Sequence, residues 1–172
     1  MNLTKRSSES LVTKSDLILP NDTNMFNNMM GGNLMYQMDI VAAIAAQRHC
    51  NNEVVTASVD NISFQQPIKL GNVITLKAFV TRAFKTSMEV KIEVHAEDIP
   101  QGIKYKSNEA FLTFVSINKD GTPQEVPGIE PETEEEQELY NSALRRRELR
   151  LILGGKISPN EATDLKKLFD EN

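Results

Sequence analysis

Residues 31–49 read Gly-Gly-Asn-Leu-Met-Tyr-Gln-Met-Asp-Ile-Val-Ala-Ala-Ile-Ala-Ala-Gln-Arg-His, and after the two glycines they contain neither glycine nor proline. Apolar residues recur in this stretch at intervals of three and four, which predicts an α-helix. One apolar stripe consists of Leu34, Met38, Val41 and Ala45. The opposite side is also apolar and carries Tyr36, Ile40, Ala43 and Ile44. A helix that is apolar on most sides is expected to be buried.

Segments typical of β-strands lie on both sides of this helix. Residues 87–97 alternate between apolar and polar side chains, which predicts a strand with one face in solvent. One long helix followed by consecutive strands favours an α+β fold over βαβ units. The economical arrangement is an antiparallel sheet curled around its own central helix. The other predicted strands are residues 10–19, 54–59, 73–84 and 104–118, with a short proline-terminated segment at 62–68.

The C-terminal part of the chain has helical signals of its own. Thr133 and Glu136 form a capping-box pattern that predicts a helix to about residue 153, before Gly154-Gly155. Ser158-Pro159-Asn160-Glu161 repeats the pattern and predicts a short last helix over 159–171. We therefore expect a main domain over residues 1–130 and a C-terminal helical extension over 131–172. The extension either packs on the sheet or mediates higher assembly.

Composition excludes several classes of protein. The 172 residues carry 19 Lys and Arg against 24 Asp and Glu, and this net charge of −5 argues against a nucleic-acid partner. The first ten residues are polar and the longest apolar stretch, residues 40–46, is too short to span a bilayer, so we expect a cytoplasmic protein without a membrane partner. One cysteine, Cys50, and two histidines leave no basis for a disulfide or a metal site. We interpret Cys50 as a packing residue and His49 as a cation at the C-terminus of the helix.

The sequence contains no phosphate-binding loop, no dinucleotide-binding glycine motif and no G-x-S-x-G elbow. The best candidate for chemistry is the start of the apolar helix, where Gly31 and Gly32 leave backbone N–H groups free to polarise a carbonyl. Asp39 follows about 11 Å further along the helix axis. A carboxylate in an apolar setting suits a general base that activates water, and the alternative is an exposed residue at one edge of the helix. From its residue type alone, Asn24 is expected to cap or turn its loop. Thr56 is expected to be an ordinary β-branched strand residue.

Several segments in a fixed order carry a resemblance to a known family. They include Leu19-Pro-Asn-Asp-Thr-Asn24, Gly31-Gly-Asn-Leu-Met-Tyr-Gln-Met-Asp39, Thr56-Ala-Ser-Val-Asp60, Lys85-Thr-Ser-Met-Glu-Val90 and Arg145-Arg-Arg147. Over about residues 10–150 the chain resembles the hotdog-fold acyl-CoA thioesterases of the cytosolic acyl-CoA hydrolase type. Where many relatives have glycine this chain has Asn27, a residue type that tolerates positive φ.

The resemblance implies a helix wrapped by an antiparallel sheet and active sites at the interface of a dimer. Asp39 then matches the catalytic acid and Asn24 the catalytic amide, contributed by opposite protomers. Thr56 matches a hydroxyl that assists the acid, and Ser87 a position close to bound coenzyme A. The implied partners are an acyl-CoA substrate and further copies of the chain, as a dimer or a trimer of dimers.

The implied reaction is hydrolysis of an acyl-CoA thioester to a free acid and coenzyme A. No cofactor is needed, because coenzyme A is part of substrate and product. We expect the carbonyl oxygen to bind the N–H groups near Gly32 and Asn33 while Asp39 takes a proton from the attacking water. Arg145 and Arg146, in a cluster with Arg147 and Arg150, either bind phosphate or form a charge run at the end of a helix.

Three alternatives use the same fold. Direct attack by Asp39 would pass through an anhydride. A hydroxyacyl-thioester dehydratase would need a histidine paired with a carboxylate, but both histidines lie outside residues 24–39. A non-catalytic acyl-CoA sensor would not release free thiol. The acyl chain length is not predicted.

Overall fold

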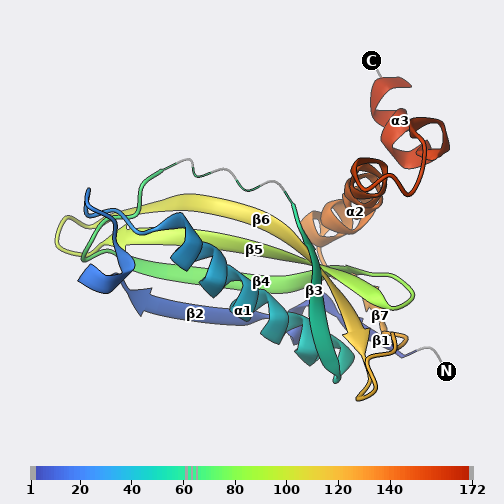
Figure 1. Cartoon of the computed structure of the whole chain (residues 1–172), viewed down its shortest axis with the longest axis horizontal. Coiled ribbons are helices and arrows are strands. Elements are labelled where there is room, and N and C mark those ends of the chain that lie inside the picture. The colour runs from blue at the N-terminus through green and yellow to red at the C-terminus, as the bar shows by residue number, and fades with distance from the viewer. Residues whose placement is uncertain (1–2, 61, 63, 65, 171–172) are drawn as a thin grey trace.

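A computed structural model describes residues 3–60, 62, 64 and 66–170 (Figure 1). Its centre is a five-stranded antiparallel sheet in the order β2-β4-β5-β6-β3. The strands are β2 (Val12–Leu17), β3 (Glu53–Val59), β4 (Val73–Ala83), β5 (Ser87–Asp98) and β6 (Ile103–Ile117). The helices are α1 (Gly31–Cys50), α2 (Glu134–Leu153) and α3 (Thr163–Asp170). This is the predicted α+β hotdog arrangement of a long helix against a curled antiparallel sheet, with C-terminal helices added.

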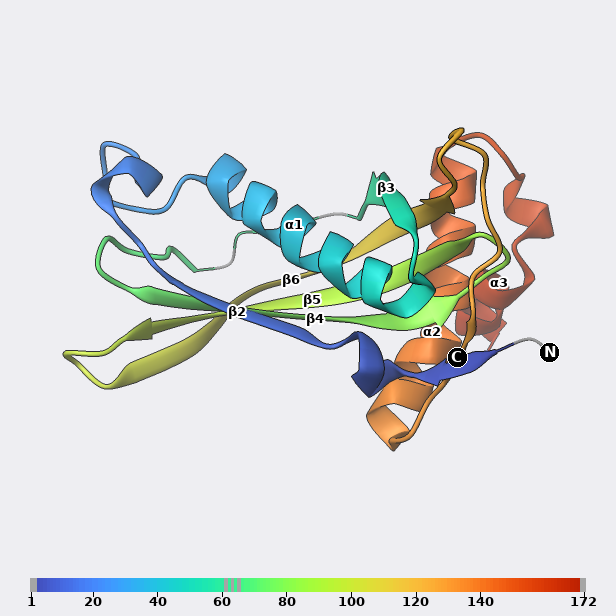
Figure 2. The same ribbon diagram turned by 90° about the horizontal axis from the view of Figure 1, so that it is seen from below.

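Helix α1 lies along one face of the sheet (Figure 2). Its buried side meets the apolar side chains of β4, β5 and β6, and Met38, Val41 and Phe114 are among the most buried residues of this core. The prediction that α1 is buried on most sides was wrong. Tyr36, Ile40 and Ile44 are exposed in the single chain, because the sheet covers only one side of the helix.

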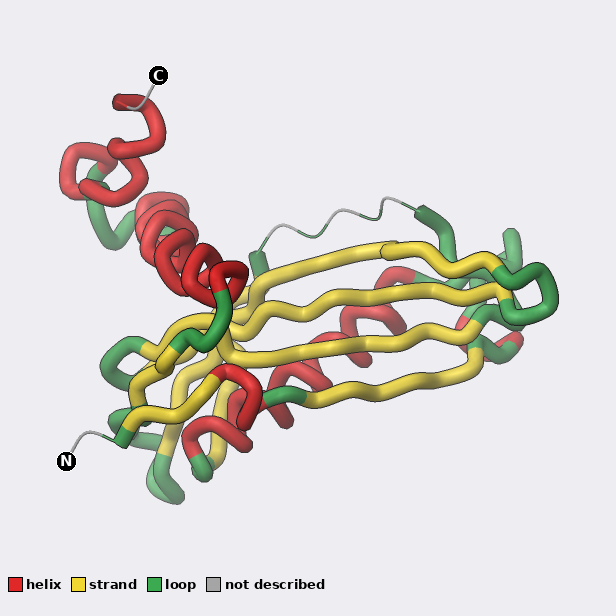
Figure 3. Tube along the Cα trace, turned by 180° about the vertical axis from the view of Figure 1, so that it is seen from behind, coloured by secondary structure: helices red, strands yellow, loops and turns green. Residues whose placement is uncertain are grey.

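Helix α2 covers part of the opposite face of the sheet, at one end (Figure 3). The prediction that the polar side of β5 faces solvent was therefore wrong for its first half. Glu89 is completely buried and Lys91 nearly so, although both alternate with the core residues Met88 and Val90. The alternation itself was read correctly, but a second layer covers the polar face.

The remaining elements differ from prediction in small ways. Thr133 caps α2 by accepting a hydrogen bond from the Glu136 N–H, as its pattern predicted. The second capping pattern starts only a 3-10 turn at Pro159–Glu161, and α3 begins after it. A short parallel pair of β1 (Thr4–Arg6) with β7 (Gly128–Glu130) was not predicted. The segment predicted at 62–68 includes positions 63 and 65, which lie outside the described residues.

Candidate active site

Asp39 and Thr56 meet on the open side of α1. The Thr56 hydroxyl donates a 2.8 Å hydrogen bond to Asp39 Oδ1. Asp39 is half-buried, so solvent or a substrate can still approach its carboxylate. Neither residue is needed for the core. The contact joins α1 to the edge strand β3 and leaves the second carboxylate oxygen available to a ligand.

A β-bulge shapes β3 at this point. Thr56 is paired with Phe114 of β6, and Ser58 is paired with the preceding residue, Thr113, so Ala57 is the extra residue. Bulges of this kind re-aim a side chain and are common beside active sites. The strand is also the last in the sheet, so its outer edge is unpaired within the described chain.

The first turn of α1 leaves backbone N–H groups free. The helix begins after Met30, and the Leu34 N–H donates to the Met30 carbonyl at 3.1 Å. The N–H groups of Gly31, Gly32 and Asn33 therefore have no partner within the helix. Space around Gly32 is clear, whereas a side chain at Gly31 would meet the Phe64 ring at 3.0 Å.

A cavity of about 310 Å³ lies against this helix end. Most of its wall is apolar, and residues from the loop before α1, from positions 64 and 66–68 and from β6 contribute. The lining includes Met29, Gly31, Leu34, Phe64, Ile68 and Asn108. The place of Phe64 beside Gly31 depends on how two distant segments meet, so sequence patterns do not show it.

Asn24 lies in the exposed loop before α1. Its side-chain carbonyl accepts hydrogen bonds from the Phe26 and Asn28 N–H groups at 2.9 and 3.2 Å. This is the loop-cap role, and it leaves the Nδ2 amide as the group that can face a ligand. Asn27 has a φ of 56°, so the predicted tolerance of asparagine for this turn is confirmed. Within the described part of one chain, no hydrogen bond joins Asn24 to Asp39.

Exposed apolar side chains occur on the loop before α1, on α1 itself and on β3. Met25 and Phe26 at the loop tip are 88% and 74% exposed, and Tyr36 on α1 is 68% exposed. Further exposed apolar residues on α1 and β3 are Met35, Ile40, Ile44, Val55 and Val59. We call this set the open apolar face. An apolar surface of this extent next to an unpaired strand edge is typical of a subunit interface.

A second cavity, of about 390 Å³, lies between the sheet and the C-terminal half of α2. Ser87, predicted to lie near coenzyme A, lines it at the start of β5. Three cationic side chains share the wall, Arg147, Arg150 and Lys156. We call this the cationic pocket. Lys156 was missed by the sequence analysis, because it follows the Gly154-Gly155 stop of α2 and belongs to no charge pattern.

The side chains of the arginine cluster lie in different surroundings. Arg145 lines a separate hollow beside Glu135 and Glu138. Arg146 points to the sheet and pairs with Glu89 at 2.8 Å. The phosphate contact expected of Arg145 and Arg146 stays a prediction, and the cationic pocket contains their neighbours Arg147 and Arg150 instead.

The interpretation of His49 as a helix C-terminal cation was wrong. The ring is completely buried, and Nε2 lies 2.8 Å from the Pro127 carbonyl. Burial lowers the pKa of His49, so the neutral ring that donates from Nε2 is favoured. No cluster of three metal-ligating side chains occurs in the part of the chain that the structure describes. Within that same part, no helix has the length and apolar character to cross a membrane.

Comparison with known proteins places these features in a family. The model of the thioesterase superfamily matches residues 26–103. An uncharacterized acyl-CoA thioester hydrolase of Bacillus subtilis is 41% identical over 143 residues, which is 83% of both chains. The chain belongs to the thioesterase superfamily. The cytosolic acyl coenzyme A thioester hydrolase of mouse is 37% identical over 147 residues, which cover 84% of this chain and 38% of the mouse protein.

Solved thioesterase structures share the fold over most of the chain. An apo-hexameric acyl-CoA thioesterase has a TM-score of 0.84 at 38% identity, covering 86% of this chain and 95% of its own. An acyl-CoA hydrolase of Staphylococcus aureus in complex with butyryl coenzyme A has a TM-score of 0.82 at 36% identity, covering 89% and 95%. Its structure is also known with an aspartate, a threonine or an asparagine replaced by alanine. Along that chain the three positions have the same spacing as Asp39, Thr56 and Asn24 here.

Proposed function

We propose that this enzyme hydrolyses acyl-CoA thioesters by general-base activation of water at a site between two protomers. The observation that carries the proposal is the hydrogen bond from Thr56 to Asp39 on the open apolar face. Membership of the thioesterase superfamily and the butyryl coenzyme A bound to the S. aureus relative support the choice of substrate. Because both histidines lie away from Asp39, with His49 buried against Pro127, a dehydratase is disfavoured.

The proposed chemistry uses groups with separate tasks. The thioester carbonyl oxygen binds the free N–H groups of Gly32 and Asn33, which stabilise the negative charge that develops in the tetrahedral intermediate. Asp39 accepts a proton from water as the water oxygen attacks the carbonyl carbon. Collapse of the intermediate breaks the carbon–sulfur bond, and coenzyme A leaves as a thiolate. Thr56 holds the carboxylate in position through its hydroxyl.

The interface part of the proposal follows from the open apolar face. Burying Phe26 and Tyr36 against a second copy would remove their large exposed surfaces from water. Pairing of β3 with a partner strand would satisfy its free edge. The Asn24 side chain uses its oxygen to cap its own loop, which leaves the Nδ2 group available. In the dimer this group would then contact Asp39 of the partner protomer. The hexameric relative supports self-association, and we propose a trimer of dimers.

The two cavities supply the binding of the substrate. The apolar cavity beside Gly31 suits the acyl group. The cationic pocket, with Ser87 in its wall, suits the phosphates of coenzyme A, since arginine and lysine side chains are the common ligands of phosphate. A cytoplasmic location belongs to the same proposal and is supported by the cytosolic mouse relative.

Release of thiol from butyryl coenzyme A by wild type and by Asp39→Asn tests the reaction. We expect the variant to lose about a hundredfold or more in kcat, which is the usual effect of removing a general base. Butyrate and free coenzyme A should form in equal amounts. A wild-type protein that binds the thioester without releasing thiol would reveal a sensor and overturn the proposal.

Mixed dimers test whether each site is shared. Asn24→Asp keeps the oxygen that caps the loop but removes the amide donor. Co-expressed with Asp39→Asn, it forms heterodimers in which one of the two sites has both native groups. With random pairing we expect about a quarter of wild-type activity from two variants that are each inactive.

Asp39→Asn mixed with Thr56→Val is the matched control, since both groups come from one chain and no native site can form. Recovery in the first mixture but not in the control supports the shared site. No recovery in either mixture would place Asn24 and Asp39 in the same protomer, whereas an Asn24→Asp variant that is active on its own would remove Asn24 from the reaction.

A further inference from the structure

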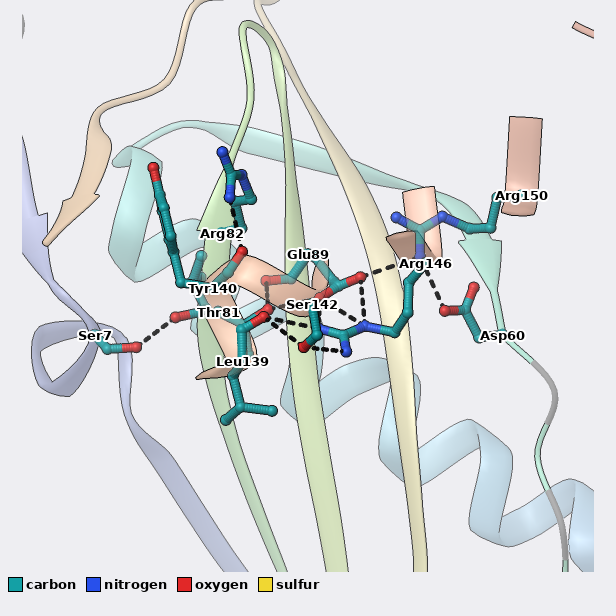
Figure 4. A network of polar contacts seen from close by, with 11 residues as sticks. Ser7, Asp60, Thr81, Arg82, Glu89, Leu139, Tyr140, Ser142, Arg146 and Arg150 are labelled. Carbon is teal, nitrogen blue, oxygen red and sulfur yellow. Dashed lines mark hydrogen bonds and ion pairs between the residues drawn. The ribbon is translucent and has the colours of Figure 1, made fainter. Parts of the chain in front are cut away.

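A buried carboxylate lies under helix α2. Glu89 of β5 is completely buried, and both of its oxygens are engaged (Figure 4). The Thr81 hydroxyl donates to Oε1 at 2.8 Å. Arg146 contacts both oxygens, with Nη2 at 2.8 Å from Oε1 and Nε at 3.2 Å from each. Arg150 Nη1 donates to Oε2 at 3.1 Å. The thioesterase chemistry described above does not use this group.

All three nitrogens of the Arg146 guanidinium group donate hydrogen bonds. Nη1 donates to the Ser142 hydroxyl and Nη2 also donates to the Leu139 carbonyl. The guanidinium lies 3.8 Å from the centroid of the Phe111 ring. Hydrogen bonds from all three nitrogens and the stacking on an aromatic ring fix the orientation of the guanidinium group. The Glu89–Arg146 pair therefore holds α2 against the sheet at a defined place.

Arg150 connects this pair to the cationic pocket. It lies one helical turn after Arg146, so both face the sheet. Its Nη1 bridges Glu89 and Asp60, the latter at 2.9 Å, while its side chain lines the pocket. Asp60 directly follows β3, the strand that carries Thr56. One side chain therefore joins the catalytic strand, the buried carboxylate and the pocket wall.

The pocket holds more positive charge than the chain neutralises. Within the described residues, no carboxylate lies at salt-bridge distance from Arg147 or Lys156. Arg147 instead stacks over the Phe84 ring, which also lines the pocket, at 4.9 Å. Thr113 also contributes to the pocket wall, and its Oγ1 is buried without a hydrogen-bond partner among the described residues. Cations that share one pocket without a carboxylate partner favour an anion, and phosphate is an anion that arginine and lysine side chains bind well.

The first half of α2 has a separate anchor. Arg82 donates to the Tyr140 carbonyl at 2.7 Å and stacks on the Tyr140 ring at 4.0 Å. Ala143 is buried against the sheet. Loss of the Glu89 charge therefore leaves the start of α2 attached, whereas the C-terminal half, which carries Arg147 and Arg150, loses both ion pairs with Glu89 and keeps the pair of Arg150 with Asp60.

We propose that Glu89 is a positioning residue for substrate recognition: by fixing Arg146 and Arg150 it holds the C-terminal half of α2 where the cationic pocket can bind the phosphates of coenzyme A. This inference rests on the proposed function. Glu89 acts through Arg150 and touches no substrate. Its effect is confined to substrates that carry the phosphates, so the acyl-transfer chemistry at Asp39 is left unchanged.

Two substrates with the same acyl group separate this role from a general loss of structure. Butyryl coenzyme A carries the phosphates, and butyryl-pantetheine has the same thioester without the nucleotide. The ratio of their kcat/KM values does not depend on the fraction of folded enzyme, because unfolding scales both alike. In Glu89→Gln we expect this ratio to fall about tenfold, the effect of losing one charge-assisted hydrogen bond, through a higher KM for butyryl coenzyme A.

Glu89→Asp retains the charge, and the same ratio is measured in this variant if Glu89→Gln does not fold. Its shorter side chain draws the guanidinium groups away from the pocket, so the ratio should fall in the same direction by a smaller factor. Glu93→Gln is the matched control on the same side of β5, since it removes a different ion pair, the one with the nearly buried Lys91, and should leave the ratio unchanged.

A ratio within about threefold of wild type in both Glu89 variants would overturn the proposal. Equal kcat/KM values for the two substrates in the wild-type enzyme would also overturn it, because phosphates would then contribute nothing. Absence of hydrolysis of either substrate by the wild type is a different result, which refutes the proposed function itself.

Discussion

Replacing Thr56 by valine removes one hydroxyl from the candidate active site and changes little else. Valine has nearly the same shape and the same preference for strands. The hydroxyl lies at the exposed edge strand and donates to Asp39 Oδ1 at 2.8 Å. We therefore expect the folded state to be retained, with a change in the free energy of unfolding below about 0.5 kcal/mol.

The expected loss of activity follows from that single hydrogen bond. A hydrogen bond to a charged acceptor contributes about 1.5 to 3 kcal/mol, and the half-buried position of Asp39 favours the lower end. If the bond orients the carboxylate in the transition state, kcat falls about tenfold. The KM for the thioester should change little, because the hydroxyl does not contact the coenzyme A moiety in the proposed arrangement.

Initial rates of thiol release from butyryl coenzyme A measure both constants, and thermal melts verify the fold. Thr75→Val is the matched control. Thr75 is also a strand threonine with a side-chain hydrogen bond, here to Ser15 at 2.9 Å, but it lies on β4 near the opposite edge of the sheet. Its kcat should equal that of wild type.

A kcat for Thr56→Val within about threefold of wild type, in a variant that melts normally, would refute the reasoning. The hydrogen bond to Asp39 would then be a feature of the free enzyme with no part in the reaction. An equal loss of kcat in Thr75→Val would instead show that the effect comes from a general disturbance of the sheet.

Three further predictions follow from burial and exposure. Phe114→Ala, at a fully buried position of β6, should lower the free energy of unfolding by about 3 to 5 kcal/mol in urea titrations. Ile40→Asp, on the open apolar face, should reduce the assembly to smaller species by light scattering while far-UV circular dichroism stays that of wild type; an unchanged mass would exclude this face from the interface. Because burial lowers the pKa of His49, the unfolded chain binds a proton there that the folded chain does not, so this contribution to stability is complete above about pH 6.5 and decreases as the pH falls below it. His49→Gln keeps a donor for the Pro127 carbonyl and should flatten the loss of unfolding free energy between about pH 7 and pH 5.5.

Local patterns were sufficient to predict the elements of this fold. Helix α1 and strands β4 to β6 lie within a few residues of their predicted bounds, because hydrophobic periodicity is a property of neighbouring residues. The pair β1–β7 escaped prediction, since strands of three residues are too short to show a periodicity. The interpretation of His49 failed for a related reason. Its position at a helix end was correct, but its burial against Pro127 depends on a segment 78 residues away.

The candidate site was predictable only in part. The resemblance implied that the Thr56 hydroxyl assists Asp39, and in the structure one hydrogen bond joins the two side chains. The basic cluster shows the opposite case. Adjacent arginines with similar sequence surroundings divide between a buried carboxylate and an open pocket, because successive residues of a helix point in directions about 100° apart.

The amino-acid sequence by itself determined that a long apolar helix packs on an antiparallel sheet, and that an acidic residue interrupts this helix after a pair of glycines. Only the tertiary structure decided that Glu89 is buried and that Arg146 and Arg150 neutralise it. The residues of these ion pairs are 57 and 61 positions apart, and they meet because α2 crosses the outer face of the sheet at one place. The alternation along β5 specifies which side chains share a face, but what covers that face is set by packing between distant segments.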